Sequence, residues 1–257
     1  MESGSPAARP YSRPVDVGPL LAPLTGAPQR SAILLDIDGT LAPIMARPEL
    51  SEVPPEAKAE LRRIVSKYLL VACVSGRSSA DAARLVGVEG IRIVGNHGLE
   101  LDPRSAKLAE VVRRFVSELT IPDGIRLEDK KLSVTLHYRE AADPEEAEHW
   151  LADVAAGALE KGLDPRWGRM VLEIRPAVPA DKGTAVRALI AESRATRALY
   201  AGDDVTDLDA FAALERGKLE CAVRVAVASS EGPNELAERA DLVVESPKAL
   251  TNLLRLL

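Results

Sequence analysis

Short apolar runs alternate with amphipathic segments over two stretches of the chain, residues 31–102 and 181–257. In the first stretch, the runs AILLDID, LLVACV and IRIVG are separated by segments whose apolar residues recur at helical spacing. The same alternation returns after Asp181 with the runs RALYAG, CAVRVAV and DLVVE. Near-continuous apolar strands are typical of parallel sheets covered on both faces. The two stretches therefore predict the halves of one α/β core, a doubly wound, Rossmann-like parallel sheet.

Residues 103–180 have a different pattern, in which two long amphipathic segments alternate with strands that are polar on one side. In KLSVTLHYR, the even positions from 132 to 138 are apolar or aromatic, and the odd positions from 133 to 139 are polar. MVLEIRP alternates in the same way. We expect an inserted α+β cap domain whose sheet packs helices on one face. Its polar face is either solvated or a lid over a site, and the pattern does not choose between them.

Residues 1–30 carry six prolines and no periodic apolar pattern, which predicts a disordered tail. The composition of the whole chain is that of a globular protein, with 46% hydrophobic and 28% charged residues among 257. A net charge of -6 and 3% aromatic residues argue against nucleic-acid binding, and no membrane-spanning segment is expected. Cys73 and Cys221 lie in apolar runs, so we expect buried thiols and a cytoplasmic location. No obligate protein partner is evident from the sequence.

Polar residues follow several of the predicted strands. Asp36 and Asp38 share one side of the chain in LLDIDGTL, at the end of the first strand. Ligands of open parallel sheets bind beyond the carboxyl ends of the strands. Each signal alone has an ordinary explanation, such as a turn, a helix cap or a solvated lysine. Together they predict one site, because the other polar residues fall at the same edge: Ser75, Lys182, Asp203 and Asp204.

Phosphoryl transfer to an aspartate is the chemistry that needs this set of groups. A carboxylate attacks phosphorus, an acid protonates the departing oxygen, and hydroxyl and ammonium groups hold the phosphate oxygens. Mg²⁺ prefers oxygen ligands, which fits Asp36 and Asp203 better than a zinc site. A calcium loop fits poorly because Leu208 occupies the position of the turn glycine. A glycosidase pair at Asp36 and Asp38 would leave Lys182 without a role.

DIDGTL, VSGR, the later lysine and GDDVTD resemble, in order, the four motifs of the haloacid dehalogenase superfamily of phosphatases. More narrowly, GNHGLE, EDK, SVTLHYR, EIRP and GDDVTDLDAF resemble the trehalose-6-phosphate phosphatases. The resemblance covers about residues 31–245. It implies a Mg²⁺-dependent enzyme that hydrolyses a small phosphosugar, trehalose 6-phosphate, through an aspartyl-phosphate.

The resemblance also implies roles for individual residues. Asp36 would be the nucleophile and Asp38 the general acid and base. Phosphate would be bound by Ser75, Gly76 and Lys182. The metal ligands would be Asp36, the carbonyl of Asp38 and Asp203, supported by Asp204 and Asp207. Sugar contacts would come from Arg77, His97, Glu128, Lys130, Arg139 and Glu173.

Two positions depart from the family pattern: Leu208 stands where an acidic residue is usual, and Ile37 where an aromatic is frequent. Both leave the identity of the sugar open. Sucrose phosphate or a glucosyl- or mannosyl-glycerate phosphate would use the same core with other cap contacts. A phosphosugar mutase shares the DxDGT motif, and a non-catalytic phosphosugar sensor is a further alternative.

Overall fold

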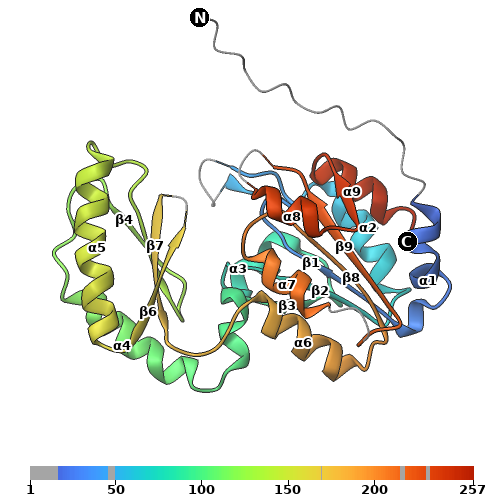
Figure 1. Cartoon of the computed structure of the whole chain (residues 1–257), viewed down its shortest axis with the longest axis horizontal. Coiled ribbons are helices and arrows are strands. Elements are labelled where there is room, and N and C mark those ends of the chain that lie inside the picture. Colours follow the sequence, from blue (N-terminus) through green and yellow to red (C-terminus); the bar gives the residue numbers. More distant parts are fainter. Residues whose placement is uncertain (1–16, 46–49, 169, 215–217, 230–231) are drawn as a thin grey trace, which may run out of the picture.

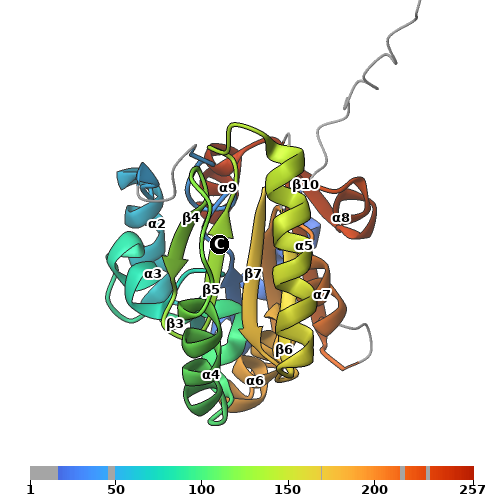
Figure 2. The same ribbon diagram turned by 90° about the vertical axis from the view of Figure 1, so that its left-hand side faces the viewer.

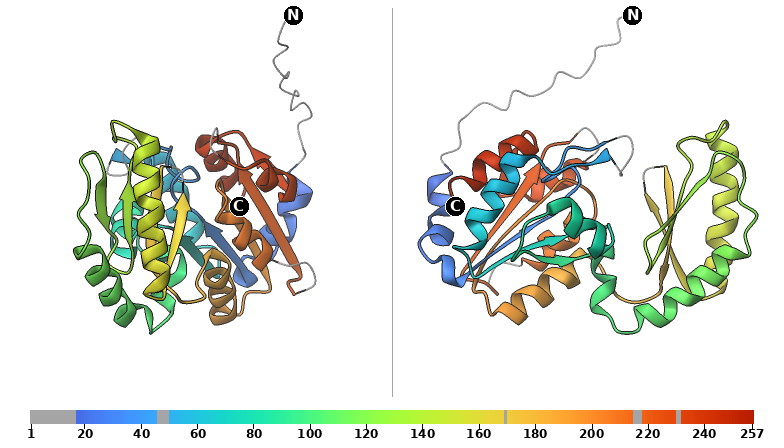
Figure 3. Two further views of the ribbon diagram at one scale, coloured as in Figure 1. Left: turned by 60° about the vertical axis from the view of Figure 1, so that its left-hand side comes forward. Right: turned by 180° about the vertical axis from the view of Figure 1, so that it is seen from behind.

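The computed structural model describes residues 17–45, 50–168, 170–214, 218–229 and 232–257. These residues form two lobes, a larger core and a smaller cap, joined at one end (Figure 1, and Figure 3, right). The expected domain boundaries near residues 103 and 180 fall in the two connections between the lobes, outside helices and strands.

A parallel sheet with the strand order β10-β9-β8-β1-β2-β3 forms the centre of the core. Its order places β1 between β2 and β8, so the first strand after the N-terminal segment is central. Every position of β1 is buried, as the continuous apolar run predicts. The strands are β1 (Ser31–Leu35), β2 (Leu70–Val74), β3 (Arg92–Val94), β8 (Arg197–Gly202), β9 (Cys221–Val227) and β10 (Leu242–Val244).

Helices cover both faces of this sheet. Ile33 and Leu35 of β1 pack into one apolar cluster with α1, α2, α3 and α9, whereas Ala32 and Leu34 pack into another with α6, α7 and α8. This arrangement confirms the doubly wound α/β core. The helices are α1 (Gly18–Thr25), α2 (Pro55–Val65), α3 (Ser79–Val86), α6 (Lys182–Ser193), α7 (Asp207–Ala213), α8 (Asn234–Arg239) and α9 (Pro247–Leu254).

The cap is an antiparallel sheet with the strand order β4-β5-β7-β6, covered by two helices on its outer face (Figure 2). The apolar positions of β5 and β7, including Leu136 and Leu172, pack against these helices. The polar positions of the same strands face the core, which confirms an inserted α+β cap. Its elements are α4 (Ser105–Ser117), β4 (Arg126–Asp129), β5 (Val134–His137), α5 (Pro144–Glu160), β6 (Leu163–Gly168) and β7 (Val171–Pro176).

The prediction of a disordered tail over residues 1–30 is wrong for its second part. Gly18–Thr25 forms α1, in which Leu21 and Leu24 are buried in the core. Pro19 lies in the first turn, where a missing N–H costs no helical hydrogen bond. Arg197 donates a hydrogen bond to the carbonyl of Pro23. Docking on the core therefore orders a segment whose composition alone suggested disorder, while residues 1–16 lie outside the described part.

Both cysteines are unpaired, Cys73 fully buried and Cys221 half-buried. None of the helices in the described part of the chain combines the length and apolar character that crossing a bilayer requires.

Candidate active site

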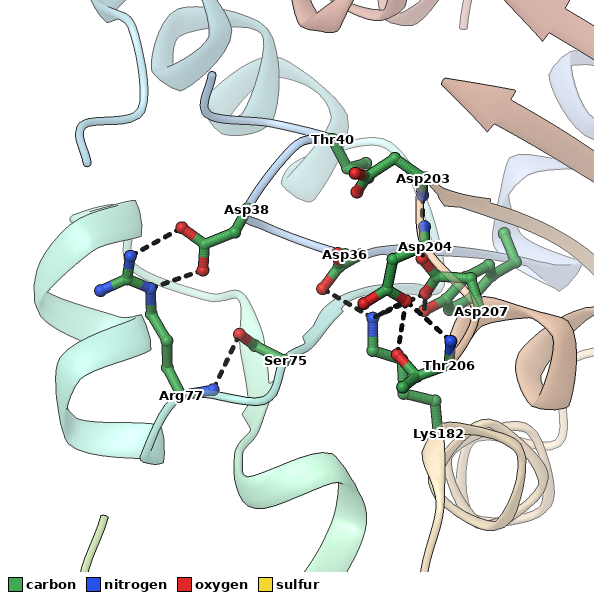
Figure 4. A network of polar contacts seen from close by, with 11 residues as sticks. Asp36, Asp38, Thr40, Ser75, Arg77, Lys182, Asp203, Asp204, Thr206 and Asp207 are labelled. Carbon is green, nitrogen blue, oxygen red and sulfur yellow. Dashed lines mark hydrogen bonds and ion pairs between the residues drawn. The ribbon is translucent and has the colours of Figure 1, made fainter. Parts of the chain in front are cut away.

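The polar residues predicted from the strand ends meet at one edge of the core sheet (Figure 4). Asp36 directly follows β1, Ser75 follows β2 and Asp203 follows β8. Lys182 is the first residue of α6, whose start is fixed by a capping box between Asp181 and Thr184. The sheet and one helix terminus therefore bring residues 167 positions apart in sequence, Asp36 and Asp203, into one cluster.

Lys182 is the centre of this cluster. Its Nζ lies 3.1 Å from Asp36 Oδ1, 2.7 Å from Asp207 Oδ1 and 3.7 Å from Asp204 Oδ1. Burial lowers the pKa of Lys182, but the three carboxylates outweigh burial and raise that pKa well above its ordinary value. Burial also raises the pKa of Asp36 well above its usual range, and the charge of Lys182 opposes this shift. The lysine therefore stays charged and stabilises the charged form of Asp36.

Asp207 organises the loop between β8 and α7. Its Oδ2 accepts hydrogen bonds from the backbone N–H groups of Asp203 and Asp204, at 2.8 and 2.9 Å. Its Oδ1 accepts from Tyr200 and Lys182, both at 2.7 Å. Gly202 permits this arrangement, because a Cβ there would lie 2.2 Å from Asp207 Cγ. Tyr200 was not predicted from the sequence, since a tyrosine inside an apolar strand is ordinarily part of the core.

Three buried carboxylates form an acidic cluster beside this lysine. Oxygen atoms of Asp36, Asp203 and Asp207 all lie within 4.8 Å of one another. Thr40 donates a hydrogen bond of 2.9 Å to Asp203 Oδ1. Burial, and then the charge of Asp207, raises the pKa of Asp203 to about 7. Several carboxylates share one buried cation, and their hard oxygen donors fit a divalent metal ion such as Mg²⁺.

Gly39 allows the β1 loop to approach this cluster. Its φ is +80°, and a Cβ at this position would lie 2.0 Å from Asp203 Oδ2. Glycine in the DIDGT motif is therefore required by both its backbone conformation and its contact with the acidic cluster.

Asp38 points away from the acidic cluster, towards Arg77 (Figure 4). Arg77 donates to both carboxylate oxygens, through Nε and one terminal nitrogen, each at 2.6 Å. Ser51 donates to the same carboxylate at 3.0 Å. The backbone N–H of Arg77 also donates to Ser75 Oγ at 3.2 Å. Arg77, predicted as a sugar contact, thus aligns Asp38 in this structure, and Ser51 is a contact that no sequence motif indicated.

His97 occupies a tight left-handed turn that closes on Gly76. Asn96, His97 and Gly98 have φ angles of 50°, 51° and 94°, a conformation that asparagine, histidine and glycine tolerate better than most residues. A Cβ on Gly76 would lie 2.5 Å from His97 Nε2, so the glycine makes room for the imidazole. Burial lowers the pKa of His97 to about 4. The imidazole is therefore neutral at neutral pH and can donate one hydrogen bond and accept another.

A pocket of about 290 Å³ lies between the core and the cap. The loop after β1 adds the apolar side chains of Ile44 and Met45, both of which are exposed. The core wall contains Asp36, Asp38, Ser75, Gly76, Arg77, His97, Lys182 and Asp204. The cap wall contains Glu128, Lys130, Thr135, His137 and Val171.

The cap wall carries its own ion pairs. Glu128 Oε2 lies 2.7 Å from His137 Nε2, and this hydrogen bond lowers the pKa of Glu128. Glu173 accepts a hydrogen bond of 2.6 Å from Ser133 and lies 3.5 Å from Lys130 Nζ. Burial alone would raise the pKa of Glu173, but nearby positive charge, led by Lys130, outweighs burial and lowers it. The polar face of the cap is thus one wall of a pocket, which answers the question that the pattern left open.

Two of the predicted sugar contacts, Glu173 and Arg139, are not among the described residues that line the pocket. Glu173 still lies beside a lining residue, 3.5 Å from Lys130 Nζ. Arg139 does not belong to a strand. It lies two residues beyond β5, is exposed, and is not one of the described residues that line the pocket. Strand alternation correctly predicted a polar face but not its extent. β5 ends at His137, and Arg139 lies in the turn that follows the strand.

Comparison with known proteins identifies the family of this chain. The family described as trehalose-phosphatase matches residues 34–247. The chain belongs to the trehalose-phosphatase family. A trehalose-phosphate phosphatase of Mycobacterium avium (strain 104) is 35% identical over 212 residues, which cover 76% of this chain and 54% of that protein. An uncharacterized glycosyl hydrolase of Mycobacterium tuberculosis is 36% identical over 211 residues, which cover 74% of this chain and 16% of that protein.

The chain spans about half the length of the curated trehalose-phosphate phosphatases that it matches. Solved structures share its fold. The C-terminal domain of a Candida albicans trehalose-6-phosphate phosphatase superposes with a TM-score of 0.69 at 22% identity, covering 93% of this chain and 95% of that chain. A protein described as related to trehalose-6-phosphate phosphatase superposes with a TM-score of 0.65 at 24% identity, covering 87% and 95%.

Proposed function

We propose that this chain is a phosphatase that hydrolyses trehalose 6-phosphate to trehalose and phosphate, with Mg²⁺ as its cofactor. One observation supports the proposal: the same pocket is lined by Asp36, Asp38 and Lys182 on the core and by polar side chains, including Glu128 and Lys130, on the cap. Membership of the trehalose-phosphatase family supports the choice of substrate.

The first step transfers the phosphoryl group to Asp36. A carboxylate oxygen of Asp36 attacks phosphorus, and the bond from phosphorus to the sugar oxygen breaks. Asp38 is the proposed donor of the proton to the departing sugar oxygen. Both of its oxygens accept hydrogen bonds from Arg77 in this structure, so Asp38 has to leave this ion pair and take up a proton before the step. The products of this step are trehalose and the phosphorylated aspartate.

The second step releases phosphate. Asp38, now ionised, takes a proton from a water molecule, and the water oxygen attacks phosphorus. The bond between phosphorus and the Asp36 oxygen breaks, which restores the carboxylate. During both steps, Ser75, the backbone N–H of Gly76 and Lys182 hold the phosphate oxygens, and Asp207 keeps Lys182 in place.

Asp36, Asp203 and the carbonyl of Asp38 would hold the Mg²⁺ ion, and Asp204 and Asp207 would support these ligands. The fit rests on the acidic cluster, whose oxygens lie within 4.8 Å of one another and whose charge a single lysine does not balance. A bound Mg²⁺ ion would offset the repulsion between the carboxylates and the anionic substrate.

The cap is proposed to bind the two sugar rings. A disaccharide offers many hydroxyl groups and no charge beyond its phosphate, so charged side chains that form hydrogen bonds with hydroxyls suit it. Glu128, Lys130 and Glu173 on the cap, with Arg77 and His97 on the core, are the proposed contacts. The unpaired thiols of Cys73 and Cys221 are consistent with action in a reducing compartment such as the cytoplasm.

The experiment is a phosphate-release screen of the purified chain with Mg²⁺ over trehalose 6-phosphate, sucrose phosphate, both glycerate-linked phosphosugars and p-nitrophenyl phosphate. We expect the highest kcat/KM for trehalose 6-phosphate and loss of activity when the metal is chelated. A higher kcat/KM for another phosphosugar would mean that this phosphosugar, and not trehalose 6-phosphate, is the substrate. A requirement for a bisphosphate activator, with phosphate returned to sugar, would indicate a mutase.

A further inference from the structure

Thr135 lines the pocket and carries a buried, unsatisfied hydroxyl. It lies on β5, one of the two central strands of the cap sheet (Figure 2), and its exposed fraction is 2%. Its Oγ1 atom is buried and has no hydrogen-bond partner among the described residues. The residue nevertheless lines the pocket. A buried hydroxyl without a partner is unfavourable, so such a group in a binding pocket needs an explanation.

The neighbours of Thr135 do not supply the missing hydrogen bond. The strand register places Glu128 of β4 and Glu173 of β7 directly opposite Thr135, one on each side. Both carboxylates have other partners, because Glu128 pairs with His137 and Glu173 accepts from Ser133. Thr135 therefore lies between two ionised acceptors that are held in place independently of it. A group that enters the pocket beside Thr135 meets a hydroxyl and a carboxylate together.

A sugar hydroxyl matches this surface, because it can accept a hydrogen bond and donate one at the same time. We infer that Thr135 is a specificity-determining residue, whose hydroxyl forms a hydrogen bond with a hydroxyl of the sugar part of the substrate while Glu128 accepts from the same or the adjacent hydroxyl. This inference rests on the proposed function, since it assumes a phosphosugar substrate. The phosphate group itself lies against the core and does not need Thr135.

Three variants of the full chain test the inference. Thr135→Val removes the hydroxyl at nearly constant shape, and Thr135→Ser keeps it. Thr196→Val is the matched control, because Thr196 carries another buried hydroxyl without a partner among the described residues and does not line the pocket. For each variant, kcat/KM is measured with trehalose 6-phosphate and with p-nitrophenyl phosphate, and the midpoint of thermal unfolding is recorded without substrate.

We expect Thr135→Val to lower kcat/KM for trehalose 6-phosphate by roughly 3- to 30-fold and to change p-nitrophenyl phosphate hydrolysis by less than about twofold. Thr135→Ser should stay within about threefold of the parent chain, and Thr196→Val within about twofold, on both substrates. The unfolding midpoint of Thr135→Val should equal or exceed that of the parent, because the substitution removes an unsatisfied polar atom.

Three results would overturn the inference: full activity of Thr135→Val on the sugar substrate, equal losses on both substrates, or a lowered unfolding midpoint that Thr135→Ser restores. The last would mean that the hydroxyl has a structural partner. If the parent chain prefers another phosphosugar, the trehalose assignment fails and the Thr135 comparison is made on the preferred substrate. A parent chain that hydrolyses no phosphosugar overturns both proposals.

Discussion

The two walls of the pocket satisfy their polar groups in different ways. On the core wall, Lys182 lies within 3.1 Å of Asp36 and 2.7 Å of Asp207, and Asp207 in turn accepts from Tyr200 and two backbone N–H groups. The cap wall contains the ion pair between Glu128 and His137. It also contains the hydroxyl of Thr135, which has no hydrogen-bond partner among the described residues. Under the proposed function, the phosphate side would be assembled before substrate binds, and the sugar side would keep hydrogen-bonding capacity for the substrate. His97, a proposed sugar contact on the core, fits this division, because its Nδ1 also has no partner among the described residues.

The carboxylates of the two walls also differ in the direction of their pKa shifts. Burial and the neighbouring carboxylates raise the pKa values of Asp36 and Asp203, and the charge of Lys182 only partly opposes the shift. The pKa values of Glu128 and Glu173 are lowered, because His137 and Lys130 lie beside them. Under the proposed function, a bound divalent cation would complete the core side, and the cap carboxylates would accept hydrogen bonds from sugar hydroxyls.

Replacing the proposed nucleophile should have the largest effect. Asp36→Asn should lower kcat for trehalose 6-phosphate and for p-nitrophenyl phosphate by at least roughly 10³-fold, because an amide is a very poor nucleophile. Its metal-free unfolding midpoint should not fall, since one of three clustered buried carboxylates loses its charge. Steady-state kinetics and thermal unfolding check both points. A loss of only a few-fold would rule out Asp36 as the nucleophile.

Replacing the proposed acid should separate the substrates. Asp38→Asn should slow the hydrolysis of trehalose 6-phosphate by about 10²- to 10⁴-fold. The hydrolysis of p-nitrophenyl phosphate should slow far less, because nitrophenolate leaves without a proton. Single-turnover measurements on both substrates provide the comparison. Equal slowing would contradict the assignment of Asp38 as the group that protonates the sugar oxygen.

Altering the cap should affect only the sugar substrate. Glu173→Gln removes the charge that lies 3.5 Å from Lys130 and should lower kcat/KM for trehalose 6-phosphate by roughly 5- to 150-fold. Glu160→Gln, at an exposed position at the end of α5, is the control and should leave both substrates unchanged. If the control and Glu173→Gln behave alike, the buried carboxylate of the cap has no role in recognition.

Changes remote from both walls should have the smallest effect on activity. Leu24→Ala in α1 should lower the free energy of unfolding by about 2–5 kcal/mol, because Leu24 is fully buried, and should leave kcat within about twofold. Leu256→Ala, at an exposed leucine, is the stability control. Denaturant unfolding measures the difference. Equal stability of the two variants would mean that α1 does not dock as described.

The clustering of the core-wall residues could be predicted from the sequence, because the end of a strand or the start of a helix fixes where a neighbouring residue lies in the fold. Asp36, Ser75, Lys182 and Asp203 each follow or begin an element whose type is evident from its apolar pattern. Parallel strands then bring these residues to one edge, whatever the details of packing.

The remaining features depend on packing that no local pattern encodes. The order of α1 comes from burial of Leu21 and Leu24 against distant strands, which overrides a proline-rich composition. Arg139 was predicted to lie on the polar face of the strand, but β5 ends at His137 and Arg139 lies in the following turn, outside the described residues that line the pocket. The isolation of the Thr135 hydroxyl appears only when every neighbouring donor and acceptor has been located.

The central claim is that the core performs the chemistry for any phosphate ester and the cap selects the sugar. The most direct measurement is the ratio of kcat/KM for trehalose 6-phosphate to that for p-nitrophenyl phosphate in a Glu128→Gln, Lys130→Met double variant, compared with the parent chain. Both residues line the cap wall. The ratio should fall by at least about tenfold, with p-nitrophenyl phosphate hydrolysis nearly unchanged. An unchanged ratio would contradict the division of roles between the two walls.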